Sequence, residues 1–128
     1  MIGERIFTGS VFEENAGYAR AVVLDGWVLV SGTTGFNPDG TYPPDVEGQC
    51  ENCFRNIGWA LEQAGTSFEN MVQIRIYCTS EEEFDRILPI IRRHCYPARP
   101  ANTTVFAQLV KPHMRVEIEV TARLPKAG

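Results

Sequence analysis

Two short apolar runs near the N-terminus predict a β-hairpin. Residues 18–24 and residues 27–31 are rich in apolar side chains, and only Asp25 and Gly26 separate them. An Asp-Gly pair between two apolar runs is typical of a type I′ turn, which needs a positive φ at both central residues. We therefore predict two antiparallel strands here, preceded by a short strand over residues 5–8.

Two later segments have the residue spacing of amphipathic helices. Over residues 46–64 apolar side chains recur every three or four positions, Asp45 can cap the N-terminus, and Gly65 suits a left-handed C-cap. Ser80 is followed by three glutamates, which is typical of a capping box with acidic residues in the first helical turn. The second helix is predicted to run from there to about His94.

The remaining patterns predict a loop and three more strands. Residues 32–44 are rich in Gly and Pro and are predicted to form a loop, whereas residues 72–78, 101–109 and 115–122 alternate in polarity like half-buried strands. The order β-β-β-α-β-α-β-β is typical of an α+β fold, in which two helices cover one face of a six-stranded, mostly antiparallel sheet. On the uncovered face we expect Asn102, Thr104, Phe106, Glu117 and Glu119.

Composition narrows the class of protein. The chain has 128 residues, 44% of them hydrophobic, and a formal net charge of −4, which favours one globular domain over residues 1–128. The acidic balance of charges disfavours a nucleic-acid partner and a polybasic surface that binds membranes.

The longest apolar runs are short compared with the roughly 18–20 residues of a membrane helix. Residues 1–5 do not resemble a signal peptide, so we expect a cytoplasmic location with reduced cysteines.

Motifs for metal, redox and phosphate chemistry are incomplete. Cys50 and Cys53 form a CxxC pair, but both lie on the apolar stripe of the predicted helix, and no second pair completes a zinc site. We interpret them as core residues. His94 and His113 belong to no catalytic arrangement that the sequence supports. The Gly-Thr-Thr-Gly segment at residues 32–35 lacks the lysine of a phosphate-binding loop.

Four polar residues remain as candidates for a site. Glu117 and Glu119 share one face of a predicted strand, about 7 Å apart from the rise per residue. That separation suits chemistry with two carboxylates and is equally typical of a solvated strand face. Tyr18 and Ser31 flank the open end of the predicted hairpin, where both residue types are common.

Taken together, these motifs resemble the RidA/YjgF family over essentially the whole chain. The matching positions, in order, are Tyr18, 30–32, 37–40, 64–65, 100–105 and 116–119. The most specific part is Pro-Ala-x-Thr-Thr-Val leading to Val-Glu-Ile-Glu. The resemblance implies a homotrimer whose sheets face inward, with a cleft for a small molecule between neighbouring subunits. It also implies hydrolysis of reactive enamines and imines to 2-oxo acids and ammonia, without a metal or an organic cofactor.

The resemblance also implies roles for individual residues. Glu117 matches the acid that orients or activates the attacking water. Thr104 stands where many members have a cysteine. The expected substrate-binding residues are Tyr18, Ser31, Gly32, Asn102 and Thr104.

Asn102 is the important departure from the family pattern. It occupies the position of the arginine that binds the substrate carboxylate, and aligning Arg99 there instead would break the 15-residue step to Glu117. Losing a bidentate guanidinium in a desolvated cleft costs roughly 2–4 kcal/mol. We therefore expect weak activity on 2-iminopropanoate, unless Arg20 or Arg75 compensates.

Three functions are compatible with the sequence. The first is a cofactor-free hydrolase, in which Glu117 acts as general base while Asn102 and Thr104 contact a neutral polar group. The second is a non-catalytic trimer with a metabolite-binding or regulatory role, which keeps the cleft and has lost the chemistry. The third is a structural trimer with a vestigial cleft. Since a fold does not determine a substrate, the resemblance supports the architecture more strongly than the reaction.

Overall fold

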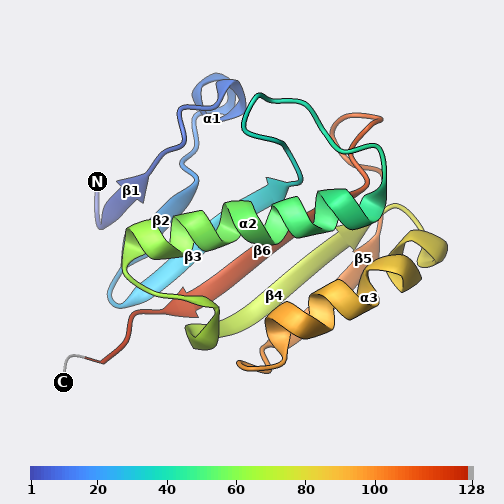
Figure 1. Ribbon diagram of the computed structural model, residues 1–128. Helices are drawn as coiled ribbons and strands as arrows, with labels where there is room; N and C mark the ends of the chain where they lie inside the picture. Colours follow the sequence, from blue (N-terminus) through green and yellow to red (C-terminus); the bar gives the residue numbers. More distant parts are fainter. Residues whose placement is uncertain (127–128) are drawn as a thin grey trace.

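The computed structural model, which describes residues 1–126, has two long helices packed on one face of a six-stranded sheet (Figure 1). The helices are α1 (Val11–Ala16), α2 (Val46–Ala64) and α3 (Glu81–Cys95), with a 3-10 turn, η1 (Phe68–Asn70). The strands are β1 (Glu4–Ile6), β2 (Ala21–Leu24), β3 (Trp27–Thr34), β4 (Met71–Cys78), β5 (Ala101–Phe106) and β6 (Val116–Arg123). This confirms the predicted α+β architecture. Within the described residues, no helix has the length and apolar character needed to cross a membrane.

The strand order is β1-β2-β3-β6-β4-β5, and only β4 and β5 pair in parallel. The parallel pair follows from its connection, because α3 lies between the two strands and carries the chain back across the sheet. All other neighbouring strands are antiparallel, as predicted. β5 is consequently an edge strand, and the C-terminal strand β6 lies in the middle of the sheet.

The predicted hairpin is confirmed, but its second strand is longer than expected. Asp25 has a φ of 51° and Gly26 a φ of 80°, as a type I′ turn requires. β3 then continues to Thr34, although the Gly and Pro residues of segment 32–44 predicted a loop from Gly32 onward. It continues because β6 pairs with it: Thr34 lies opposite Glu117, beyond a bulge between Val30 and Thr33.

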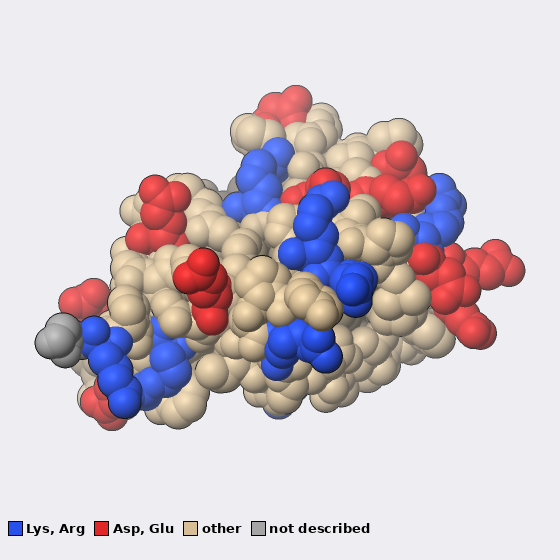
Figure 2. Space-filling model, turned by 60° about the horizontal axis from the view of Figure 1, so that its bottom comes forward, with Lys and Arg blue, Asp and Glu red and all other residues tan. Residues whose placement is uncertain are grey.

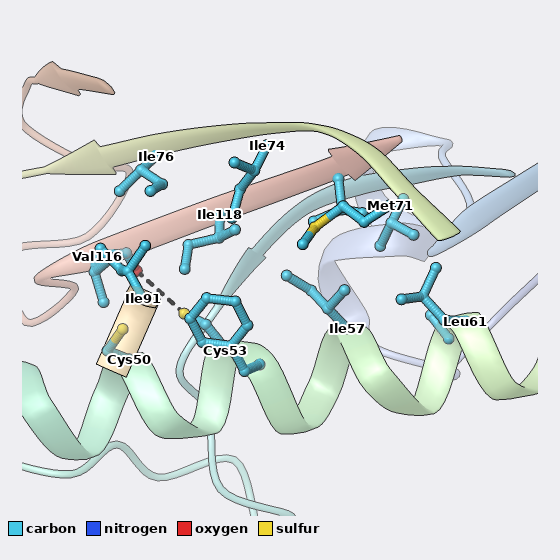
Figure 3. Packing of buried hydrophobic residues seen from close by; sticks show 14 of the residues in the cluster. Cys50, Cys53, Ile57, Leu61, Met71, Ile74, Ile76, Ile91, Val116 and Ile118 are labelled. Carbon is cyan, nitrogen blue, oxygen red and sulfur yellow. Dashed lines mark hydrogen bonds between the residues drawn. The ribbon is translucent and has the colours of Figure 1, made fainter. Parts of the chain in front are cut away.

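The buried face of α2 and the inner face of the sheet form the core, as Figure 3 shows. Cys50 and Cys53 are fully buried in it and free, and burial raises the pKa of both thiols. Cys53 Sγ donates a long hydrogen bond of 3.8 Å to the carbonyl oxygen of Val116. The interpretation of this CxxC pair as part of the core is therefore confirmed.

A bulge in β4 corrects one predicted facing. The register against β6 shifts between Met71 and Gln73. The alternation over residues 72–78 predicts that Val72 shares the buried face of Ile74 and Ile76. Instead Met71 points into the core and is 2% exposed, while Val72 is 41% exposed.

The predicted facing of β5 is also wrong. Asn102 lies beside Ile74, and Thr104 lies beside Ile76, in the parallel register with β4. Laterally paired residues point to the same face of a sheet, and both isoleucines are buried on the helix side. Asn102 and Thr104 therefore lie on the helix side of the edge strand.

Phe106 lies on the helix side as well. Its ring is 6.0 Å, centre to centre, from the ring of Phe84 in α3. Glu117 and Glu119 point to the opposite face, as predicted, where Glu117 pairs laterally with Tyr77. The alternation of polar and apolar residues shows which residues of one strand point to the same side. Which side of the sheet that is depends on the register with the neighbouring strand.

Candidate functional site

A cavity of about 550 Å³ opens beside the β2–β3 hairpin. Its polar lining includes Tyr18, Arg20, Gly32, Thr34 and Glu117, which come from the hairpin and from β6. The segments around α1, the loop after β3 and the connection between β5 and β6 complete the wall. Three of the predicted site residues, Tyr18, Gly32 and Glu117, thus line one cavity of a single chain.

Glu117 lies against the backbone of Gly32. A Cβ atom at position 32 would be only 2.2 Å from Glu117 Oε2, so a glycine leaves room for the carboxylate. Burial raises the pKa of Glu117, the positive charge of Arg20 lowers it, and the negative charge of Glu119 raises it, with a net upward shift. A half-buried carboxylate with a raised pKa is a stronger base than one in water and is suited to take a proton from a bound water.

Arg20 brings a buried positive charge to this cavity. Its side chain is 5% exposed, and its Nε atom lies 3.6 Å from Glu13 Oε2. Nη1 donates hydrogen bonds of 3.2 Å to Thr33 Oγ1 and 3.4 Å to the carbonyl oxygen of Gly32. The guanidinium also stacks over Tyr18, 5.5 Å from the ring centre. From the sequence, Arg20 was predicted only as one of two arginines able to compensate for the arginine that is absent at position 102.

The short helix α1 holds the partner of Arg20, and the sequence patterns did not reveal it. Ser10 caps this helix by accepting a hydrogen bond from the backbone NH of Glu13, and Gly17 ends it with a φ of 74°. The carboxylate of Glu13 is 4% exposed and accepts hydrogen bonds from the backbone NH and hydroxyl of Thr8. Six residues are too few for a periodic pattern, but the Ser10-x-x-Glu13 spacing of a capping box is a signal for this helix.

The loop after β3 is hydrogen-bonded to α2 through asparagine side chains that were not among the predicted site residues. Asn56 Nδ2 donates to the carbonyl oxygens of Thr34 and Phe36, each at 3.2 Å. Asn52 Nδ2 donates to the carbonyl oxygen of Gly35 at 3.1 Å and to the side chain of Asn37 at 2.8 Å. One wall of the cavity is therefore held by the longest helix.

Ser31 makes a structural contact. Its hydroxyl donates a 2.7 Å hydrogen bond to the carbonyl oxygen of Ala19, across the open end of the hairpin. It lines a separate surface hollow that it shares with Tyr18. Within one chain, Ser31 thus lies next to the cavity and outside its lining.

Asn102 and Thr104 lie away from the cavity, on the opposite face of the sheet. Thr104 Oγ1 donates a 2.9 Å hydrogen bond to Asn102 Oδ1. Asn102 borders a hollow of about 220 Å³ at the end of α3, together with Arg92, Tyr96 and Arg99. The structure therefore does not bring these two predicted binding residues together with Glu117 of the same chain.

Glu119 and Arg75 interact with each other on the uncovered sheet face. Arg75 Nη1 lies 3.8 Å from Glu119 Oε1, and the same oxygen accepts a 2.9 Å hydrogen bond from the hydroxyl of Tyr77. That hydrogen bond raises the pKa of Tyr77. The two glutamates of this strand therefore differ: Glu119 has protein partners, whereas Glu117 faces the cavity.

Across residues 1–126, no group of three or more His, Cys, Asp or Glu side chains is arranged to hold a metal ion.

Comparison with known proteins identifies the family. The family model described as Endoribonuclease L-PSP matches residues 8–124, which include every strand except β1 and all the cavity residues named above. The chain belongs to the RidA/YjgF family. The crystal structure of Rv2704 from Mycobacterium tuberculosis, a member of the YjgF/YER057c/UK114 family, is similar with a TM-score of 0.87 and 32% identity. That similarity covers 94% of this chain and 98% of the other.

Two other relatives show the range of names in the family. A RutC family protein of Aquifex aeolicus is 32% identical over 108 residues, covering 82% of this chain and 86% of its own. A mouse protein named 2-iminobutanoate/2-iminopropanoate deaminase is 26% identical over 107 residues, covering 82% of this chain and 79% of its own. Some proteins that are similar to this chain are therefore named as imine deaminases.

Proposed function

We propose that this protein is a cytoplasmic homotrimer that hydrolyses a small imine or enamine, without a cofactor, in the cavity that contains Glu117. The observation that carries the proposal is the position of Glu117. Its carboxylate is half-buried, has a raised pKa and lies against Gly32 on the wall of a cavity large enough for a metabolite. The name of the mouse relative supports the reaction class.

The proposed reaction needs one water and one proton-transferring group. A water held by Glu117 attacks the imine carbon, so that a C–O bond forms and the π electrons of the C=N bond move to nitrogen. Glu117 takes a proton from the water and delivers a proton to the nitrogen. Glu117 then transfers the proton of the new hydroxyl group to the nitrogen. As the C–N bond breaks, its electron pair leaves with ammonia and the C–O bond becomes the carbonyl of the product. An enamine enters the same sequence after it tautomerises to the imine, in which its carbon gains a proton and its nitrogen loses one.

The positions of Asn102 and Thr104 are the reason for proposing a trimer. Both face away from the cavity of their own chain, so they can contact a ligand next to Glu117 only from a neighbouring subunit. The uncovered face of the sheet suits such an assembly because it exposes large apolar side chains. Leu29 is 47% exposed there and Val105 43%. We therefore propose that the sheets face inward.

The asparagine at position 102 limits the proposed activity. Its neutral amide cannot form the bidentate, charge-assisted pair that a guanidinium forms with a carboxylate. We expect ammonia release from freshly generated 2-aminoacrylate to be about a hundredfold slower than for an arginine-bearing relative. A rate equal to that of such a relative would contradict this expectation.

A single substitution separates the hydrolase from the alternative, a non-catalytic binding protein. Glu117→Gln keeps the size of the side chain and removes the base. Under the proposed function, hydrolysis of a panel of imines falls by about a hundredfold or more, while product binding largely survives. If the unchanged protein hydrolyses none of the panel yet binds the corresponding 2-oxo acids, the binding role is the correct one.

A nucleic-acid substrate is less well supported, although the family model is named after a ribonuclease. The chain carries a net charge of −4. On the face shown in Figure 2, Lys and Arg side chains form separate groups among Asp and Glu side chains and do not form a continuous basic stripe. RNA binding relies on such a stripe to neutralise phosphates. A small molecule therefore fits this protein better.

A further inference from the structure

The substitution at position 102 raises the question of which cation meets an anionic ligand in this protein. Arg75 is paired with Glu119 on the uncovered sheet face. Arg92 and Arg99 lie next to Asn102, but both are exposed and stack on the ring of Tyr96, at 4.5 Å and 4.7 Å from its centre. None of these three arginines lines the cavity of Glu117 in its own chain.

Arg20 differs from those arginines in burial and in position. It is 4% exposed, lines the same cavity as Glu117, and is held in place by Glu13 and by the acceptors of Gly32 and Thr33. Its Nε atom is buried and, although it lies 3.6 Å from Glu13 Oε2, makes no hydrogen bond among residues 1–126. Over the same residues, Nη2 donates to no protein acceptor. A buried guanidinium with unused donors favours an anionic acceptor.

The rest of the cavity wall restricts what that anion is attached to. Beyond the polar group around Arg20 and Glu117, the lining includes the side chains of Phe12, Phe36, Tyr42, Val110 and Met114. Aromatic and aliphatic walls gain from burying apolar ligand surface. At about 550 Å³, the cavity also exceeds what a three-carbon imino acid fills.

We infer that Arg20 binds the carboxylate of the ligand and that the ligand is a 2-imino acid, or its 2-oxo acid product, with an apolar side chain. The inference rests on the proposed function for the reaction and gives Arg20, the residue directly before β2, the role of the arginine that is absent at position 102. The three-carbon 2-iminopropanoate stays a poor substrate because its methyl group is too small to fill the apolar part of the cavity. The carboxylate lies at the Arg20 end of the cavity, the reacting carbon lies within reach of a water on Glu117, and the side chain contacts the apolar wall.

The inference is tested by binding of matched probes. We expect 4-methyl-2-oxopentanoate to bind at least tenfold more tightly than 4-methyl-2-pentanone, which has the same apolar chain but no carboxylate, on the scale of charged hydrogen bonds. Arg20→Gln is expected to weaken binding of the oxo acid by about tenfold or more and to leave the ketone unchanged. Arg99→Gln is the matched control, because Arg99 is exposed on the other side of the sheet, and its effect should stay within about twofold.

A measurement on the unsubstituted protein covers the case in which Arg20→Gln does not fold. Nitrogen-15 spectra of the arginine side chains should show the buried Nε–H of Arg20 shifting as 4-methyl-2-oxopentanoate is added, while those of Arg92 and Arg99 stay in place. A shift confined to Arg92 or Arg99, or a loss of oxo-acid binding in Arg99→Gln, overturns the inference. So does a folded Arg20→Gln protein that keeps its affinity.

The outcomes also separate this inference from the proposed function. If Glu117→Gln and the unsubstituted protein bind the oxo acid equally, and neither releases ammonia from any imine, the hydrolase proposal fails while the role of Arg20 stands. If imines are hydrolysed with a rate that Arg20→Gln does not change, the role of Arg20 fails while the hydrolase proposal stands.

Discussion

The carboxylate of Glu117 occupies the space where a side chain at Gly32 would lie, since a Cβ there would come within 2.2 Å of Glu117 Oε2. Two strands far apart in the chain, β3 and β6, create this contact through their antiparallel pairing. Gly32 lies within the bulge between Val30 and Thr33 and lines the cavity. The absence of a side chain at one residue therefore decides the position of the proposed base at another.

Gly32→Ala is expected to displace the Glu117 carboxylate with little loss of stability. The clashing atom is at the end of a flexible side chain, so it can move, and Gly32 has no positive φ that only glycine tolerates. We expect kcat/KM for imine hydrolysis to fall by about tenfold or more, because a displaced carboxylate no longer holds the attacking water in the geometry that the transition state needs. The melting temperature serves as the control. An alanine variant that is folded and fully active would show that this contact does not matter.

The acid limb of the pH–rate profile should report the environment of Glu117. Its pKa is raised above the ordinary value of 4.5, mainly by burial, so kcat/KM should fall as the pH drops through a point above 4.5. Because the charge of Glu119 contributes to the upward shift, Glu119→Gln should move the limb to lower pH. The rate above the limb, measured in the same experiment, should change little. An unmoved limb would mean that Glu117 is not the titrating base.

Glu117→Gln should stabilise the fold at neutral pH. A carboxyl group whose pKa is raised on folding binds its proton more tightly in the folded state, so its contribution to stability decreases as the pH rises from 4.5 through the folded pKa. Above that window the buried charge is a cost that glutamine removes. We expect the melting temperature at pH 7 to rise by about 2 °C or more, with the gain disappearing in acid. A lower melting temperature at pH 7 would contradict this assignment.

Glu13→Gln tests the buried ion pair that holds Arg20. The pair is almost inaccessible, with the two side chains 4% and 5% exposed, so neutralising the acid leaves a buried guanidinium without its counter-charge. We expect a loss of about 2–4 kcal/mol in the free energy of unfolding, measured by urea denaturation. Glu14→Gln, at the exposed neighbouring position of α1, is the matched control and should have an effect within about 0.5 kcal/mol. Equal effects of the two substitutions would refute the role of the pair.

Leu29→Glu should dissociate the proposed trimer. Leu29 is 47% exposed on the uncovered sheet face, and a buried carboxylate at a subunit interface is strongly unfavourable. Size-exclusion chromatography with light scattering should show three chains for the unsubstituted protein and one for the variant. Leu88→Glu is the control, because Leu88 is comparably exposed, at 43%, on helix α3. An unsubstituted protein that elutes as a monomer would remove the basis for a site shared between subunits.

Local sequence determined most of the secondary structure of this protein. The Asp25-Gly26 turn, the Asp45 cap of α2 and the Ser80 cap of α3 were all predictable, because each depends on contacts within a few residues. The same holds for the buried cysteines of α2, whose spacing alone places them on its apolar face.

Only the tertiary structure decided how these elements meet. Pairing with β6 extended β3 beyond Ser31, and the parallel register with β4 turned Asn102 toward the helix side. The meeting of Arg20 with Glu117 in one cavity likewise depends on strands that are far apart in the chain. Turns and caps arise from short-range hydrogen bonds, which a local pattern encodes, whereas strand register is set by the packing of the whole sheet, and the site is built from that register.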